Sequence, residues 1–172
     1  TNMVESLKCA SHEFEGGFVL SYADIVYQED ILLKMMNSNE SIAVACDMDW
    51  ENYWKERFEN PLIDAERFRF DKNKIIEIGG KAKSLDEIES QYIGLLSFSI
   101  HGVNILNEWF SDRYKNENMF ITDMITDLIN CRKSVAAVRI NKGWLEIDDL
   151  HDLEVAKKYI SQTSRGSVKV LR

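Results

Sequence analysis

The sequence predicts an α/β domain in which helices cover both faces of one mixed, mostly parallel sheet. Short apolar runs that are typical of buried strands alternate along the chain with segments that have the apolar spacing of helices. Two alternating runs within 66–80 flank Asp71-Lys72-Asn73, which favours a hairpin and makes the sheet mixed. The 172 residues are 45% hydrophobic and include one proline, which fits one compact domain with a buried core.

The first half of the chain is expected to begin with a helix and to continue with strands that end on carboxylates. From Met3 to Phe14 the apolar residues fall roughly on one face of a helix. The segment 48–61 is aromatic and charged and ends at Pro61, so we expect a short helix or an ordered loop there. In this half, strands are predicted at 18–28, 41–47 and 66–80, and helices at 3–14, 29–39 and 48–61.

The second half keeps the alternation of strands and helices. The acidic segment 84–91 is predicted to be a surface connection, and Thr122 or Asp123 stands near the start of a helix, where N-caps are found. The more basic and polar residues 162–172 are predicted to form a tail or linker, which leaves 1–161 as the domain. In this half, strands are predicted at 92–99, 134–140 and 144–148, and helices at 100–114, 122–133 and 149–160.

Charge and cysteine content argue against several classes of protein. The 21 basic and 29 acidic residues leave a formal charge of −8, which repels a nucleic-acid backbone. Cys9, Cys46 and Cys131 are odd in number and far apart, which indicates neither a disulfide framework nor a zinc site. No apolar run approaches the roughly 20 residues that span a bilayer, and no signal peptide is evident. We therefore expect a cytoplasmic protein without a nucleic-acid or membrane partner.

Carboxylates stand where several predicted strands end. Asp24, Asp47, Glu146 and Asp148 occupy such positions, and in open α/β sheets ligands bind at the carboxyl ends of the strands. Two aspartates brought together at one edge repel each other unless a divalent cation lies between them, and oxygen ligands suit Mg²⁺. Because Mg²⁺ is usually held by one or two carboxylates plus substrate phosphates, this pattern predicts a nucleoside triphosphate or another polyphosphate as ligand.

Helix capping is the alternative explanation for some of these acidic residues. Asp149 is more simply read as the N-cap of the helix predicted at 149–160, while capping and metal binding stay equally open for Asp148. Asp123 is likewise expected to cap its helix rather than to line an acceptor pocket. Asp24 has the further alternative of marking only a strand-to-loop turn.

Three aromatic residues, Trp50, Tyr53 and Trp54, raise the alternative of a binding pocket for a quaternary ammonium group. Such a cation gains on the order of 1 kcal/mol over an indole face. The helical spacing of these residues equally predicts ordinary core packing. We expect Trp54 in the core and keep Trp50 as a candidate pocket wall.

Several segments together resemble the sugar-nucleotidyltransferase superfamily, in its phosphocholine cytidylyltransferase-like branch. They are "TNMVESL", "FVLSYAD", "ACDMDW" with "PLIDAERFRFDKNKIIEIGGK", "YIGLLSFS" and "GWLEIDDLHDLEVAKKY", in this order along residues 1 to about 160. The W-x-E-I-D-x-x-x-D-L close is the most specific of them. The resemblance implies a Rossmann-like three-layer α/β/α domain that transfers a nucleotidyl group, with CTP favoured, from a nucleoside triphosphate to a phosphorylated small alcohol such as choline phosphate, releasing pyrophosphate.

The resemblance also implies roles for particular residues. Asp24 and Asp148 match the two metal aspartates, and Lys81 or Lys83 matches a catalytic lysine that relatives have after "EIG". The remaining matched or neighbouring positions are expected to face the substrates, and they are Glu146, Trp50, Asp123, Trp144 and Tyr92. The cofactor that the resemblance implies is Mg²⁺.

Two departures from the family pattern bear on function. Nothing matches the glycine-rich G-x-G-x-R loop that holds the triphosphate, so we expect the first strand and this loop to be missing and the fragment alone to be inactive. Ser90-Gln91 also stands where relatives often have Gly-Glu before "YIG". The alternative to an enzyme is a non-catalytic binding or regulatory module of the same ancestry. The sheet edge left open by a missing strand predicts pairing with another chain, for example as a homodimer.

Overall fold

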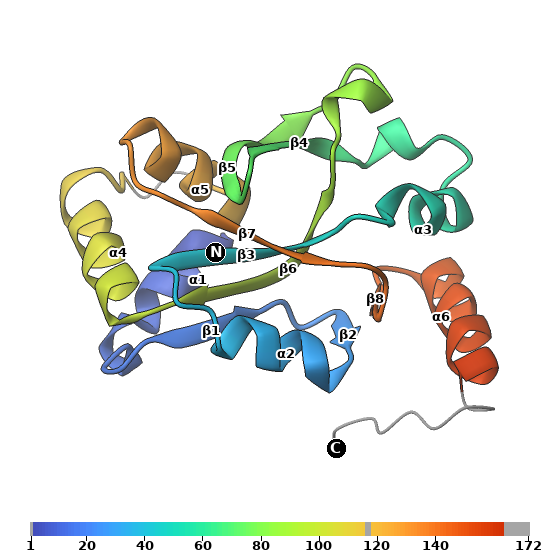
Figure 1. The fold of residues 1–172 in the computed structure, drawn as a ribbon, viewed down its shortest axis with the longest axis horizontal. Coiled ribbons are helices and arrows are strands. Elements are labelled where there is room, and N and C mark those ends of the chain that lie inside the picture. The colour runs from blue at the N-terminus through green and yellow to red at the C-terminus, as the bar shows by residue number, and fades with distance from the viewer. Residues whose placement is uncertain (1, 116–117, 164–172) are drawn as a thin grey trace.

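The computed structural model describes residues 2–115 and 118–163 and contains one six-stranded sheet with helices around it (Figure 1). In the order in which they lie side by side, its strands are β1 (Phe18–Ser21), β6 (Gln91–Phe98), β3 (Ile42–Asp47), β7 (Ala136–Ile140), β5 (Lys74–Lys81) and β4 (Glu66–Asp71). A separate two-stranded sheet pairs β2 (Ile25–Tyr27) with β8 (Trp144–Glu146). The strand predicted at 18–28 is therefore divided between two sheets.

Six α-helices and three short 3-10 helices are found in the described part of the chain. The α-helices are α1 (Met3–Cys9), α2 (Glu29–Met36), α3 (Trp50–Arg57), α4 (Ile100–Asp112), α5 (Ile121–Asn130) and α6 (Leu150–Thr163). The 3-10 helices are Ser11–Glu13, Pro61–Ile63 and Leu85–Glu87. The ambiguous segment 48–61 contains a true helix, α3, and the linker predicted at 162–172 lies outside the described residues beyond Thr163.

The sheet is mixed, as predicted, but the expectation that it is mostly parallel is wrong. Within the described residues, β3–β7 is the parallel pair, whereas β1–β6, β6–β3, β7–β5 and β5–β4 are antiparallel. A parallel neighbour requires a crossover connection, usually a helix. The chain instead passes from β4 to β5 through a hairpin and from β5 to β6 through a 3-10 helix, so neither step supplies the crossover helix that a parallel arrangement usually needs.

Strand β3 shows how the two faces of the sheet are covered. Successive side chains of a strand point to opposite faces, and Ile42, Val44 and Cys46 join the core formed with α1, α4 and α5. Ala43 and Ala45 join the core formed with α2, α3 and α6. The small alanines leave room on the second face for the large aromatic residues of α3. These two cores confirm the predicted three-layer arrangement of helices around one sheet.

No helix within residues 2–115 and 118–163 is long and apolar enough to span a membrane.

An ion pair between α4 and α5 provides a test of packing on the first face. Asp127 accepts hydrogen bonds from Trp109 Nε1 at 2.7 Å and from Arg113 Nε and Nη2 at 2.8 and 3.0 Å. The hydrogen bonds from Arg113 hold the pKa of Asp127 below its usual value. Asp127→Asn should therefore lower the free energy of unfolding by about 1 kcal/mol at neutral pH. The difference should begin to shrink as the pH falls through the unfolded-state pKa of about 3.9, and it should vanish only below the lower pKa of folded Asp127, which urea unfolding at several pH values would show.

Candidate functional site

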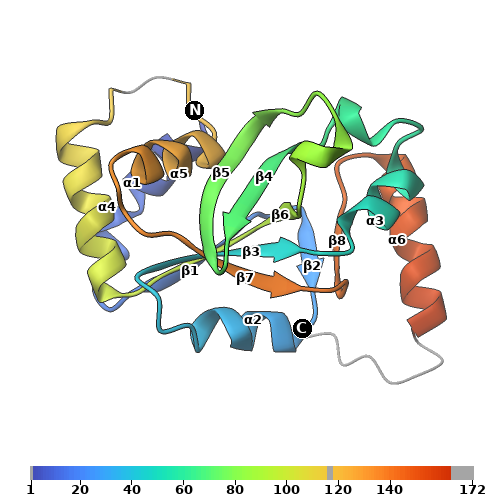
Figure 2. The same ribbon diagram turned by 45° about the horizontal axis from the view of Figure 1, so that its top comes forward.

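Strands β3 and β7 lead toward the small β2–β8 sheet, beside which α3 and α6 lie (Figure 2). In that sheet Ile25 pairs with Glu146, and the Ile147 N–H donates to the Asp24 carbonyl oxygen at 2.9 Å. The chain segments that carry Asp24 and Asp148 are thus adjacent, although more than 120 residues separate them in sequence. Both side chains are exposed. Joint coordination of one Mg²⁺ by these two aspartates stays a prediction.

A buried arginine that was not among the predicted site residues, Arg57, contacts the acidic residues at the end of β8. Its guanidinium group donates to Glu146 Oε2 at 2.5 Å, to Asp148 Oδ2 at 2.8 Å and to both oxygens of Asp152 at 2.8 and 3.0 Å. The Arg57 side chain is only 1% exposed, whereas that of Asp148 is 53% exposed. The signal in the sequence was its place one turn after Tyr53 on an aromatic helix, which turns a basic residue toward the core.

Tyr53 fixes the backbone of the same strand end. Its hydroxyl group donates to the Glu146 carbonyl oxygen at 3.1 Å and accepts from the Glu146 N–H at 2.9 Å. Glu146 is therefore held through its backbone and through its carboxylate by two residues of α3. Tyr53 also packs edge-on against Trp54 and Trp144, which explains why its aromatic neighbours are core residues.

The carboxylates of this cluster have different electrostatic surroundings. Burial, assisted by Asp148 and Asp64, raises the pKa of Glu146 to about 7, although Arg57 opposes the shift. Burial is the largest single influence on Asp152 and disfavours its charged form, but the hydrogen bonds and charge of Arg57 together with the N–H groups of Asp148 and Asp149 lower the pKa of Asp152. Three carboxylates meet one guanidinium, so the cluster carries excess negative charge when all three are ionised.

Two tyrosines and a glutamate lie near the same cluster. Tyr22 and Tyr92 contact each other edge-on, with ring centroids 5.6 Å apart. Burial is the main cause that raises the pKa of Tyr22 to about 12, and Glu66, Glu146 and Asp24 contribute through their charges. The Tyr92 hydroxyl oxygen is buried and makes no hydrogen bond of regular geometry among the described residues. The charges of Glu66 and Glu146 act on both tyrosines, while contact of Tyr92 with a substrate stays a prediction.

Asp47, a candidate ligand because it ends β3, is instead a buried hydrogen-bond acceptor. It accepts from the Asp49 N–H at 2.9 Å, from the Lys142 N–H at 3.0 Å and from Trp144 Nε1 at 2.9 Å. Its side chain joins the end of β3 to the turn before β8. Trp144, which was expected to face substrate, is only 5% exposed, and its indole N–H donates a hydrogen bond to Asp47. In this structure both residues support the site from within.

Asp47→Asn should lower the free energy of unfolding by about 1–2 kcal/mol. Asparagine has the shape of aspartate, but its amide group presents N–H donors toward positions where the chain already supplies three donors. At least one of these donors would lose its acceptor inside the fold. Urea unfolding followed by tryptophan fluorescence would measure the effect, and a variant as stable as the wild-type protein would contradict the role given to Asp47.

The other predicted site residues lie outside the cluster of carboxylates around Arg57. Asp123 caps α5, because its Oδ2 accepts from the Phe120 N–H at 2.8 Å, which confirms the preferred reading. Trp50 is 4% exposed and packs edge-on against Trp54 in the core, so its role as a pocket wall stays a prediction. Lys81 ends β5 and Lys83 follows it; both are exposed, and nothing in the geometry selects one of them as catalytic.

The first of the paired glycines before Lys81, Gly79, allows close packing between β5 and α5. Gly79 has a left-handed backbone with φ of 83°, and a Cβ atom there would lie 2.9 Å from Thr122 Cβ. The start of α5 therefore sits directly on β5. Thr126 strengthens this contact by donating from Oγ1 to the Ile78 carbonyl oxygen at 2.6 Å.

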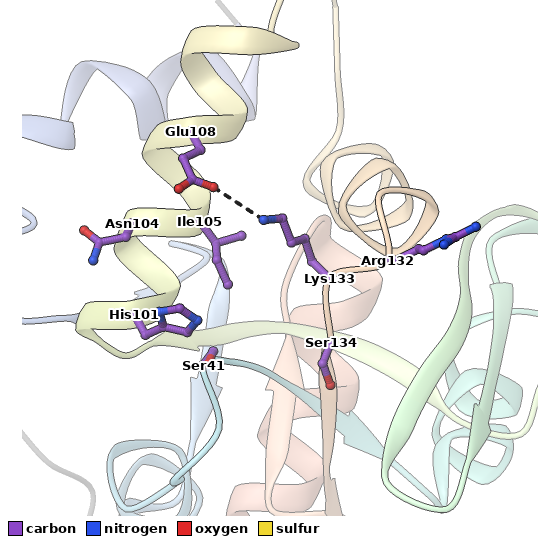
Figure 3. A pocket seen from close by; sticks show the side chains of 8 residues that line it. All are labelled: Ser41, His101, Asn104, Ile105, Glu108, Arg132, Lys133 and Ser134. Carbon is purple, nitrogen blue, oxygen red and sulfur yellow. Dashed lines mark hydrogen bonds and ion pairs between the residues drawn. The ribbon is translucent and has the colours of Figure 1, made fainter.

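A cavity of about 290 Å³ lies at the opposite end of the sheet, away from the acidic strand end. Ser41 and Ser134, which precede the parallel strands β3 and β7, line it together with His101 of α4. Glu108 and Lys133 form an ion pair at 3.4 Å across one side of it (Figure 3). Because Asp47 ends β3 and Ser41 precedes it, this cavity is separate from the candidate site.

The fold and the grouping of carboxylates at the strand ends are those of an α/β domain of the nucleotidyltransferase type. The inositol-1-phosphate CTP transferase of T. maritima matches 98% of this chain with a TM-score of 0.71 and 15% identity. A Bacillus anthracis protein assigned as a glucose-1-phosphate thymidylyltransferase matches 99% with a TM-score of 0.67 and 16% identity. At these identities the two structures show the fold.

The sequence relationship identifies the family. The CTP:phosphoglutamine cytidylyltransferase of Campylobacter jejuni is 40% identical over 169 residues, which cover 90% of this chain and 67% of that protein. The chain belongs to the sugar-nucleotidyltransferase superfamily and, within it, to the family of this cytidylyltransferase. No family model matches the chain. The chain spans 64% and 63% of the lengths of the two structural neighbours.

The donor set at the acidic strand end fits Mg²⁺. Among the described residues, Asp148 Oδ2 is bound to Arg57, while the large exposure of this side chain leaves Oδ1 available. No group of three or more His, Cys, Asp or Glu side chains in the described ranges is arranged to enclose a metal. A cation bound here would therefore have one or two carboxylate ligands and would need substrate phosphates to complete its coordination, and its binding stays a prediction. Asp24 and Asp148 are the residues that would hold it.

Proposed function

We propose that the protein is a Mg²⁺-dependent cytidylyltransferase that moves CMP from CTP to a phosphorylated small molecule and releases pyrophosphate. The observation that carries the proposal is the backbone pairing that places Asp24 beside the E-I-D strand end, in a chain 40% identical to a cytidylyltransferase. Bound Mg²⁺ would neutralise charge on the triphosphate. Nucleotidyl transfer depends on positioning and charge neutralisation more than on covalent help from the protein.

The acceptor is proposed to bind so that a phosphate oxygen attacks the α-phosphorus of CTP in line with the leaving pyrophosphate. Asp24 and Asp148 hold the negative charge that attracts the cation, and Arg57 and Tyr53 keep β8 in place. Tyr22 lies close enough to Asp24, Glu66 and Glu146 for their charges to raise its pKa, and its hydroxyl group would be offered to the part of the acceptor away from its phosphate. Phosphoglutamine, which the relative's name gives, and choline phosphate are the first acceptors to compare.

Pyrophosphate release tests this proposal in the full-length protein. CTP, UTP, ATP and GTP would each be combined with phosphoglutamine, choline phosphate and inositol phosphate, with and without Mg²⁺. We expect release with CTP, with one acceptor strongly preferred, and loss of release with a chelator. A protein that releases no pyrophosphate in any combination would favour the non-catalytic module. A homodimer and a cytoplasmic location are also proposed, and light scattering and cell fractionation test them.

A further inference from the structure

The contacts of Arg57 exceed what a structural ion pair needs. Asp152 alone matches the fork of the guanidinium group, with Arg57 Nε and Nη2 at 2.8 and 3.0 Å from its two oxygens. The same guanidinium also reaches Glu146 and Asp148, the two acidic residues of the E-I-D strand end. Tyr53, Trp54 and Phe58 surround it, with ring centroids 5.1–5.6 Å from Cζ. Its position is therefore set by packing as well as by charge.

The partner that anchors Arg57 is itself fixed. Asp152 Oδ2 also accepts from the Asp148 N–H at 3.0 Å, and the Asp152 N–H donates to Asp149 Oδ1 at 2.9 Å. The first turn of α6 thus holds Asp152, Asp152 holds Arg57, and Arg57 holds one oxygen of Asp148. The Asp148 side chain is nevertheless 53% exposed, and the residue before it, Ile147, is hydrogen-bonded through its N–H to the Asp24 carbonyl oxygen.

We infer that Arg57 is a positioning residue that orients Asp148 and Glu146 for a bound divalent cation, an inference that rests on the proposed function. Carboxylates that bind metals are themselves held by hydrogen bonds, and loss of such a partner typically costs 10–100-fold in metal affinity or activity. The one positive charge of Arg57 faces three carboxylates, which keep a net negative charge when all are ionised. Arg57 can therefore orient these carboxylates without cancelling their attraction for a metal ion. Lysine cannot reproduce the arrangement, because its ammonium group lacks the planar fork.

Arg57→Lys in the full-length protein is the decisive variant. It keeps the positive charge but cannot contact all three carboxylates in the same geometry. Binding of Mn²⁺ alone, followed by water-proton relaxation, reports the metal site without turnover. We expect Arg57→Lys to weaken Mn²⁺ binding at least tenfold and to lower kcat by a similar factor, with a smaller change in the KM for the acceptor. Asp148→Asn supplies the baseline for binding at other sites.

Arg113→Lys is the matched control. Arg113 also forms a two-pronged pair with an aspartate, Asp127, at 2.8 and 3.0 Å, but it lies between α4 and α5 on the other core. This control should lower the melting temperature while Mn²⁺ affinity and kcat stay within twofold of wild type. A comparable thermal loss in both variants, with the metal effect confined to Arg57→Lys, separates positioning from general stability.

Asp152→Asn provides a second variant in case Arg57→Lys does not fold. It keeps the size of the anchor but weakens its hold on Arg57, and Mn²⁺ binding should weaken several-fold. Mn²⁺ affinity within twofold of wild type in the folded variants would overturn the inference even if they melt earlier. The proposed function fails separately, and the inference with it, if the wild-type protein shows neither Asp148-dependent Mn²⁺ binding nor pyrophosphate release.

Discussion

Asp148→Asn should lower the turnover of the full-length protein by about 10²–10⁴-fold while the fold persists. The substitution removes a charge from the proposed metal site, and each factor of ten corresponds to about 1.4 kcal/mol of lost transition-state stabilisation. The fold should persist because asparagine keeps a carbonyl oxygen that can accept from Arg57 Nη2. Arg57 also retains Glu146 and Asp152 as partners. Pyrophosphate release under saturating CTP and Mg²⁺ would measure the loss.

Asp149→Asn is the matched control for this prediction, because it makes the same chemical change at the next residue. Asp149 caps α6 by accepting from the Asp152 N–H, and asparagine is as good an N-cap as aspartate. Turnover and stability should both stay near wild type. Equal activity of the two variants, or equal loss in both, would remove Asp148 from the metal site.

The order of strands and helices could be predicted because it depends on local pattern. Residues 42–46 are apolar throughout and are fully buried within β3, and the last helix begins after Asp149 as capping predicted. The direction of β6 could not be predicted in this way. It depends on which neighbours β6 finds in the sheet, and the antiparallel pairing of β6 with both β1 and β3 leaves no local mark in the sequence.

Residues of the candidate site could be predicted where a metal-binding side chain stands at the end of a predicted strand. They could not be predicted where the role of a residue depends on partners far away in the sequence. Asp24 and Asp148 were selected because they end strands, and the β2–β8 pairing brings their chain segments together. Asp47 satisfies the same rule but is bound by Trp144, 97 residues away. Arg57 lies 89 residues from Glu146, in the aromatic and charged segment 48–61 that was predicted only as a short helix or an ordered loop. Only the fold shows that one carboxylate is a core acceptor and one arginine is buried.

Gly102→Ala should destabilise the protein by roughly 3 kcal/mol, because helix α4 lies directly on the segment before β3. A Cβ atom at Gly102 would stand 1.9 Å from the Ser41 carbonyl oxygen and 2.9 Å from its carbon. Backbone must therefore move, and overpacking of this kind typically costs about 1–3 kcal/mol and occasionally more. The Ser41 oxygen also accepts from the Ser99 N–H at 3.0 Å, so its displacement would disturb the start of α4.

The higher helix propensity of alanine opposes the loss of stability from the steric clash, so the two effects predict changes of opposite sign for Gly102→Ala. Within a helix, alanine is more favourable than glycine by about 1 kcal/mol. Helix propensity alone therefore predicts that Gly102→Ala is more stable than the wild-type protein. Gly16→Ala is the matched control, since no atom lies within 4 Å of a Cβ built there, and it should be near neutral. A fall in melting temperature of several degrees in Gly102→Ala alone would show that close approach of α4 to Ser41, rather than chain flexibility, requires glycine at this position. An unchanged or higher melting temperature would mean that the α4 contact relaxes easily.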